Sequence, residues 1–242
     1  MNAPVRSYLN SVLLFGLACV AWSGSLASHD AAAFAVQEPL PSPSPTATPL
    51  GATPAGAAKY VNDFAQAWAS VTSYTATVTV FEQKGAQVQN LVFDYAFRKP
   101  STVTVRVVSG PNAGAILSWD GGTTVVASRG RGLLALLKKT YSLHDAQVTT
   151  IRGSSIDQLS FGAILSDAQQ AGVLSEAPSD AIDGVAADAV ELIPAASPSD
   201  AGLSREVVDL STITHLPVRV LGFDGSALVI RIGFSNVIVA GS

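Results

Sequence analysis

Residues 71–107, VTSYTATVTVFEQKGAQVQNLVFDYAFRKPSTVTVRV, decide the fold of this chain. Apolar and polar side chains alternate there with a period of two in three consecutive runs: residues 74–80, 91–98 and 102–107. A Lys84-Gly85 turn separates the first two runs, and a Lys99-Pro100 corner separates the last two. Alternation of this kind is typical of antiparallel strands that bury one face. The stretch therefore predicts three sequential antiparallel strands.

The pattern on either side of this stretch extends the prediction. Before it, apolar residues recur at helical spacing over residues 57–71, which predicts an amphipathic helix. After it, two apolar runs flank Asp120-Gly121-Gly122, which is typical of a hairpin. We thus expect one helix followed by five strands.

The second half of the chain predicts two further helices and four strands. A leucine cluster, closed by Lys138 and Lys139, indicates a short helix. Ser155 to Gln158 forms a capping box that predicts a helix through about Ala171. Period-two strands are expected after it at residues 185–193, 203–210, 218–223 and 227–239. The expected fold class is α+β and mainly antiparallel, with about nine or more strands, because no regular strand–helix alternation supports a parallel sheet.

The N-terminal residues predict export rather than fold. A basic start, an apolar run of about ten residues and small residues at the end make residues 1–35 a secretory signal, with cleavage after Ala27 or Ala35. Cys19, the only cysteine, lies inside it and would be the anchor if the chain were lipidated. Residues 36–56 are rich in proline, serine and threonine and are expected to form a disordered linker. Residues 57–242 are then one domain, in the periplasm or on the extracytoplasmic face of the cell membrane.

Composition narrows the possible partners. The net charge is −4, and only 13% of residues are charged, with no basic cluster, so nucleic acid is not an expected partner. Hydrophobic residues make up 48% of the chain. Two explanations fit this content: an alanine-rich genome together with the signal segment, or a domain that lines an apolar cavity as well as filling a core.

No sequence motif points to catalysis. His144 and His215 stand alone, without the spacing of a zinc site, and no nucleophile elbow occurs. Residues 130–135 match a dinucleotide-binding glycine pattern, but the expected parallel strand and acidic residue do not follow, so a hinge is the simpler interpretation. We expect no enzyme, no cofactor and no metal. A site built from carboxylates or from His144 remains the third hypothesis for function.

Three segments resemble the LolA-like superfamily of periplasmic lipoprotein carriers. They are VTSYTATVTVFEQKG (71–85), LVFDYAFRKPSTVTVRVVSGPNAGAILSWDGGTTVVAS (91–128) and VVDLSTITHLPVRVLGFDGSALVIRIGFSNVIVAG (207–241). The shared features are the Ser-Tyr-x-Ala strand start, the basic-Pro corner, the Asp-Gly hairpin and the closing Phe-Ser-Asn-Val. The superfamily also includes LprG-type and RseB-type lipid-binding domains. The resemblance implies an incomplete antiparallel β-barrel with helices over its open concave face.

The function that the resemblance implies is the binding of acyl chains in an apolar cavity. The partner would be a lipid or an acylated lipoprotein, with an inner-membrane export complex as a further candidate. The protein would be a monomer that meets the membrane only through its cargo, or through Cys19 if that residue is lipidated. The alternative is a regulatory or scaffold module of the envelope that binds a protein partner with the same fold.

The resemblance also supplies candidate site residues. The expected cavity and lid residues are Val78, Phe93, Tyr95, Phe97, Val103, Val105, Leu133, Leu134 and Leu137. Residues 133–137 would form a gate hinged at Gly130 and Gly132. Lys99 stands where the carriers have an arginine tied to lid closure, and Arg98 precedes it. We expect Lys99 or Arg98 to hold the gate shut by bonding to main-chain carbonyl groups.

Overall fold

The computed structural model describes residues 55–129, 138–195 and 202–241. The elements are α1 (Ala55–Ser70), β1 (Val71–Lys84), β2 (Gln87–Arg98), β3 (Thr102–Ser109), β4 (Ala115–Trp119), β5 (Thr124–Arg129), β6 (Lys138–Ser142), α2 (Phe161–Gln170), β7 (Val173–Ala177), β8 (Ala187–Ile193), β9 (Arg205–Ser211), β10 (Pro217–Asp224) and β11 (Ala227–Gly241). Within the described ranges, neither helix has the length and apolar character that crossing a membrane requires.

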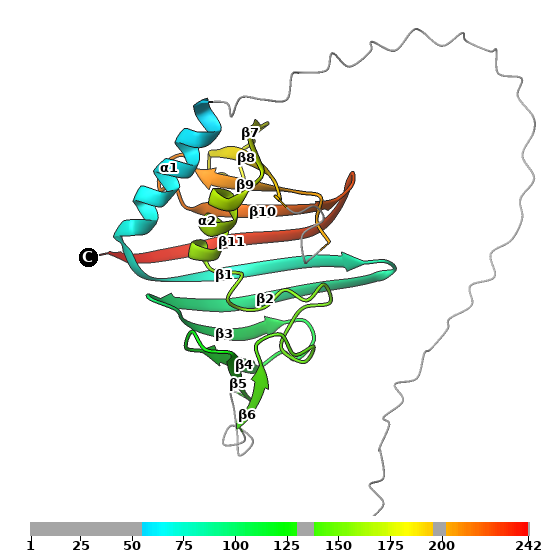
Figure 1. The fold of residues 1–242 in the computed structure, drawn as a ribbon. Coiled ribbons are helices and arrows are strands. Elements are labelled where there is room, and N and C mark those ends of the chain that lie inside the picture. Colours follow the sequence, from blue (N-terminus) through cyan, green and yellow to red (C-terminus); the bar gives the residue numbers. More distant parts are fainter. Residues whose placement is uncertain (1–54, 130–137, 196–201, 242) are drawn as a thin grey trace, which may run out of the picture. The chain divides into compact units, whose positions relative to one another are not determined.

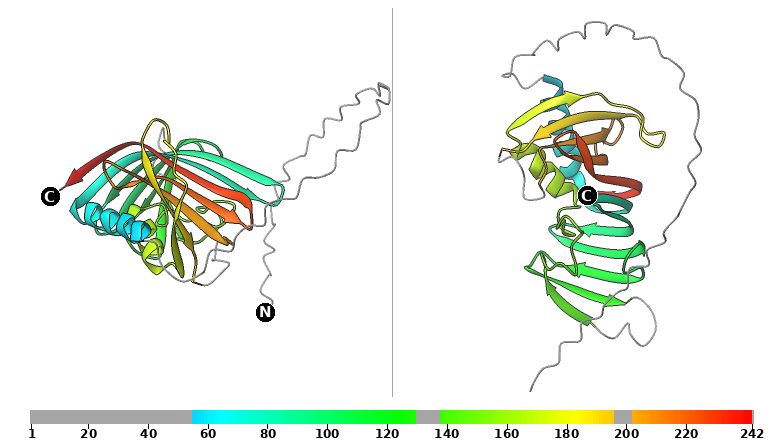
Figure 2. Two further views of the ribbon diagram at one scale, coloured as in Figure 1. Left: turned by 90° about the horizontal axis from the view of Figure 1, so that it is seen from above. Right: turned by 90° about the vertical axis from the view of Figure 1, so that its right-hand side faces the viewer.

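All the strands form one antiparallel sheet of 11 strands in the order β6-β5-β4-β3-β2-β1-β11-β10-β9-β8-β7. Each half is a meander of sequential hairpins, and the pairing of β1 with β11 joins the halves. The sheet does not close, and β6 and β7 are its two edges. It curves strongly, and both helices lie on its concave side (Figures 1 and 2). The predicted α+β class, with an open antiparallel half-barrel and covering helices, is confirmed.

The period-two pattern of residues 71–107 is borne out in the burial of β1, β2 and β3. Tyr74, Ala76, Val78 and Val80 are buried in β1, and the residues between them are not. These side chains belong to one core cluster that fills the concave side together with α1 and α2. The alternation therefore identified both the strands and the face that they bury.

Aromatic side chains fill the half of the concave side beneath the helices. Tyr74 and Phe161 stack with ring centroids 4.2 Å apart and an interplanar angle of 3°. Trp68 of α1 meets Phe161 at 6.3 Å, and Phe234 of β11 meets it at 5.2 Å, both edge to face. Large rings from α1, α2, β1 and β11 therefore pack this half of the concave side densely.

Two predicted helix boundaries are wrong. Lys138 and Lys139 do not end a helix but begin β6, where they pair with Ser128 and Ala127 of β5. The leucines that precede them lie outside the described residues. Strand pairing along the exposed edge of β5 outweighs the helical pattern of two lysines. Neither edge strand, β6 nor β7, was predicted.

Only half of the capping box forms, and it is followed by a single turn. The Ser155 amide donates to Gln158 Oε1 at 2.9 Å, as a capping box requires, but the Gln158 amide donates to the Ser155 carbonyl and not to its hydroxyl. Helix α2 starts later, at Phe161, where the Ser160 hydroxyl accepts from the Ala163 amide at 3.1 Å. The Ile156 carbonyl, inside the predicted helix, instead accepts from the Tyr95 hydroxyl of β2 at 3.3 Å, so a contact with the sheet competes with the local helix signal.

Candidate functional site

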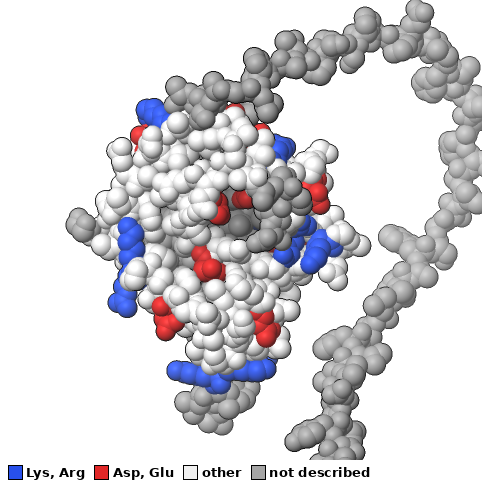
Figure 3. Space-filling view, in the orientation of Figure 1, with Lys and Arg blue, Asp and Glu red and all other residues white. Residues whose placement is uncertain are grey.

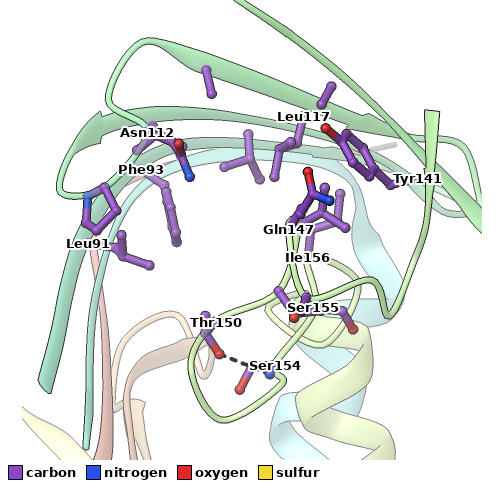
Figure 4. A pocket seen from close by; sticks show the side chains of 18 of the residues that line it. Leu91, Phe93, Asn112, Leu117, Tyr141, Gln147, Thr150, Ser154, Ser155 and Ile156 are labelled. Carbon is purple, nitrogen blue, oxygen red and sulfur yellow. Dashed lines mark hydrogen bonds between the residues drawn. The ribbon is translucent and has the colours of Figure 1, made fainter. Parts of the chain in front are cut away.

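The half of the concave side away from the helices contains a cavity of about 750 Å³. Strands β2 to β6 form one wall, and the chain between β6 and α2 forms the other (Figure 4). We call residues 144–160 the covering segment. Apolar side chains contributed by the two walls are Leu91, Phe93, Val105, Leu117, Ala127, Val148, Ile156 and Leu159.

The size of the inward side chains explains why this half is hollow. The inward positions of β4 and β5 include Ala115, Leu117 and Ala127, and Leu117 pairs directly with Ala127. The matching positions near the helices carry Tyr74 and Phe97, which are fully or almost fully buried. Alanine fills much less of the space between the sheet and the covering segment than an aromatic ring does. A cavity therefore remains where the small residues gather.

The covering segment is tied to the sheet by one buried acidic residue. Glu82 of β1 is 0% exposed. Its Oε1 accepts from the hydroxyl groups of Thr150 and Ser154, both at 2.8 Å, and its Oε2 accepts from the Arg152 amide at 3.0 Å. Burying a carboxyl group is costly unless its oxygens are hydrogen-bonded, and here both are. Glu82 thus fixes residues 150–154 at one position on β1.

Two further bonds support the same attachment. Gln89 of β2 accepts from the Ile151 amide at 3.0 Å, and the Tyr95 hydroxyl donates to the Ile156 carbonyl at 3.3 Å. Burial raises the pKa of Tyr95, so its hydroxyl keeps the proton that it donates. The covering segment is therefore attached at both β1 and β2, and the cavity lies between these attachments and the β4–β6 end of the sheet.

The lining of the cavity is not wholly apolar. Asn112, Gln147, Thr150 and Ser154 contribute polar side chains, several of which are drawn in Figure 4. Charged side chains come only from Arg129 and Lys139 among the residues found to line it. A pocket whose apolar walls are combined with placed polar groups is the usual form of a small-molecule site.

The structure separates the candidate cavity residues into two groups. Phe93 and Val105 line the cavity. Val78, Tyr95, Phe97 and Val103 are buried but do not line it; they lie in the packed core, because the helices and the covering segment cover that part of the sheet. Leu133, Leu134 and Leu137, with the proposed hinge glycines, lie outside the described residues.

The two basic candidates have different surroundings. Lys99 Nζ donates to the Trp68 carbonyl at 2.6 Å and the Ala69 carbonyl at 3.4 Å, and it lies 4.4 Å from the centre of the Trp68 ring. Lys99 therefore bonds to main-chain carbonyls of the last turn of α1, where a cation is favourable. Arg98 is exposed on the other face of β2. Their role in closing a gate stays a prediction.

Sequence reasoning missed Glu82 and the covering segment. Glu82 follows Val78 and Val80 on the inward face of β1. An acidic residue at an inward position could therefore have indicated a buried hydrogen-bonded site. Apolar residues in the covering segment show no helical or strand periodicity. The residues that it contacts in β1 lie 68 to 72 positions earlier in the sequence. Only the folded structure brings these groups together.

Metal and histidine chemistry find little support in the described part of the chain. No group of three or more histidine, cysteine or acidic residues there is placed to hold a metal ion. His144 is exposed at the start of the covering segment and does not line the cavity. The described residues therefore place no metal-binding group and no part of the cavity lining at His144.

One carboxyl group has a strongly shifted pKa. Burial, together with the negative charge of Asp167 on α2, raises the pKa of Glu206 on β9 to about 7. Glu206 therefore holds its proton more tightly in the folded protein than in the unfolded chain. The stability that it contributes is present below about pH 4.5 and is lost as the pH rises through about 7.

We expect Glu206→Gln to remove this pH dependence. The unfolding free energy of the unchanged protein should fall by about 2 kcal/mol between about pH 4 and about pH 8 because of this one group, after allowance for its partial exposure. Urea unfolding across that range measures the effect. An equally steep decline in Glu206→Gln would contradict the assignment, and Asp224→Asn at an exposed turn is a matched control.

Comparison with known proteins yields structural matches alone. No protein-family model matches the chain, and no curated protein does. Among solved structures, the lipoprotein LppX from Mycobacterium tuberculosis matches at 13% identity over 76% of this chain and 96% of its own, with a TM-score of 0.45. LprF from Mycobacterium bovis matches at 16% identity over 77% and 95%, with a TM-score of 0.44. A LolA superfamily protein from Nitrosomonas europaea matches at 10% identity over 77% and 94%, with a TM-score of 0.38. The chain is similar to these proteins over about three quarters of its length.

Proposed function

We propose that this protein is an exported, non-enzymatic binding or carrier protein that holds an acyl chain of a lipid or lipoprotein. The observation that carries the proposal is the mainly apolar cavity of about 750 Å³ between the sheet and the covering segment. Its volume falls within the range of about 300–1,000 Å³ that is usual for ligand sites. An acyl chain would bury its surface against these walls at a gain of about 25 cal/mol per Å².

The shape of the fold supports a carrier in another way. The cavity lies at the open end of the concave side, between strands with small inward residues, and the aromatic core lies elsewhere. Ligand could therefore occupy the cavity while the packed half keeps the sheet folded. The sequence resemblance to lipoprotein carriers, and the export signal expected at residues 1–35, agree with a role in lipoprotein sorting or envelope lipid transport.

The alternative is a regulatory or scaffold module that binds a protein partner. Such a module would need no open cavity, and its covering segment could pack directly on β4 and β5. The small side chains of Ala115 and Ala127 argue against that packing. We therefore prefer the carrier.

A side chain that fills the cavity should abolish most of the binding. In Ala127→Trp, the new ring would displace about 60 Å² of apolar contact, which costs about 1.5 kcal/mol or about tenfold in affinity. Binding is measured by native mass spectrometry of the purified protein and by titration with a fluorescent fatty acid. Val108→Trp adds the same ring at an exposed position of β3 and should bind normally.

The two variants also separate the hypotheses. Absence of bound lipid and of probe binding in the unchanged protein would refute the carrier. Equal binding by Ala127→Trp and Val108→Trp would place the ligand outside this cavity. Thermal unfolding of both variants shows whether the sheet is intact.

A further inference from the structure

The charged side chains that line the cavity, among the described residues, are both positive. Arg129 and Lys139 are the charged residues that line it, and no aspartate or glutamate is among the described residues of its lining. The whole chain has a net charge of −4, so the sign here is opposite to that of the protein. A positive mouth on an otherwise acidic protein selects the charge of the molecule that enters it.

The two cations lie together at one end of the cavity. Arg129 ends β5 and pairs with Ala115, and Lys139 in β6 pairs with Ala127 of β5. Positive side chains gather at the edge of the sheet that β6 forms, at the foot of the view in Figure 3. Both cations are exposed, so both can meet a polar group at the mouth of the cavity.

Lys139 is held over the cavity by an aromatic ring. Its Nζ lies 4.5 Å from the ring centre of Tyr141, two residues along the same strand. Tyr141 is half-buried and points into the cavity in Figure 4. A cation over an aromatic face keeps its charge while its position is restrained. The ammonium group therefore faces the mouth of the cavity and not the outer surface of the sheet.

Neither cation is neutralised by an acidic side chain in the described part of the chain. The ion pairs found there are Lys59–Asp63, Arg205–Glu191 and Arg219–Asp209. Arginine presents a planar set of donors that suits carboxylate and phosphate, and lysine adds a second charge. The side-chain amides of Asn112 and Gln147, which line the same cavity, supply further N–H donors.

We infer that the ligand is an amphiphile with an anionic head group, a carboxylate or a phosphate, that Arg129 and Lys139 bind at the β5–β6 end of the cavity. The hydrocarbon part lies against Phe93, Val105 and Leu117. This inference rests on the proposed function, because it names the head group of the molecule whose chain fills the cavity.

The test compares single-chain amphiphiles of equal chain length on the purified full chain. Palmitate and palmitoyl lysophosphatidic acid are anionic, monopalmitoylglycerol is neutral, and hexadecyltrimethylammonium is cationic. Each competes with a fluorescent fatty alcohol below its micelle concentration. We expect the anionic ligands to bind about tenfold more tightly than the neutral one at low salt, and this preference to shrink as salt is added.

Matched charge variants locate the preference. Arg129→Gln/Lys139→Gln should bind the neutral ligand as the unchanged protein does and lose the preference for anions. Lys84→Gln/Arg106→Gln removes two exposed charges that do not line the cavity and should keep the preference. Melting curves of both double variants check that each is folded.

The remaining outcomes are also decisive. If no amphiphile binds, the proposed function fails; if all four bind equally, only the inference about the head group fails. If both double variants lost the preference for anionic ligands equally, that preference would come from the overall charge of the protein, and the inference would be overturned. If inorganic phosphate also displaced the neutral ligand, that result would show an anion site that does not depend on a hydrocarbon chain, and it would overturn the inference as well.

Discussion

Replacing Phe161 with alanine is expected to lower the free energy of unfolding by about 3–5 kcal/mol, the usual cost of removing a fully buried phenylalanine. Phe161 is 0% exposed and stacks on Tyr74 at 4.2 Å. Its amide also donates to the Tyr74 hydroxyl at 3.2 Å. The ring thus joins the start of α2 to β1, and the cavity left behind would border several other rings that cannot collapse into it.

Urea unfolding and thermal melting measure this effect. For a domain of this size, each kcal/mol shifts Tm by about 2–4 °C, so the melting temperature should fall by about 6–20 °C. Phe81→Ala makes the same change on the outer face of β1, where the ring is only half-buried against Arg231, and should cost about 1 kcal/mol. Equal losses in the two variants would show that the aromatic cluster is not the centre of stability.

Glu82→Ala is expected to cost about 3 kcal/mol, because it leaves the donors of Thr150, Arg152 and Ser154 without their common acceptor. The covering segment would then lose its attachment to β1. Unlike Phe161→Ala, this change should open one region before the rest unfolds. Limited proteolysis should cut near residues 150–154 in the variant while the sheet remains protected.

Glu82→Gln provides the matched comparison. Glutamine keeps one carbonyl oxygen and the shape of the side chain, so it should retain part of the attachment and cost roughly half as much. Gln89→Ala removes only the bond to the Ile151 amide and should cost about 1 kcal/mol. Proteolysis that is unchanged in Glu82→Ala would mean that other contacts hold the covering segment.

The strands of the sheet could be predicted from the sequence because each is a local pattern. Alternation from Tyr74 to Val107 gives both the strands and their buried face, and Asp120-Gly121-Gly122 gives a hairpin. Edge strands β6 and β7 have five residues each and little alternation, so they could not be recognised. A short edge strand depends on its one neighbour more than on its own residues.

The candidate site was less predictable, because a cavity is defined by what its walls leave empty. Phe93 and Tyr95 are both inward aromatic residues of β2, yet one lines the cavity and the other lies in the core and bonds to Ile156. The difference depends on what lies opposite, and the covering segment reaches those positions from far along the chain. The sequence likewise did not predict that Arg129 and Lys139 lie close together, because the register between β5 and β6 determines their distance.

The pairing of β1 with β11 has a consequence for the order in which the protein can assemble. The Thr72 hydroxyl bonds to the Ala240 carbonyl, 168 residues away, in the middle of the sheet. Closing a loop of that length costs about 4–5 kcal/mol of chain entropy before any pairing repays it. Each half-sheet can form from hairpins, but β1 has an unpaired side until the 15 residues of β11 are available. During synthesis, the pairing of β1 with β11 is therefore completed last. Until then β1 can pair with another chain, so a truncation within β11 should favour aggregation.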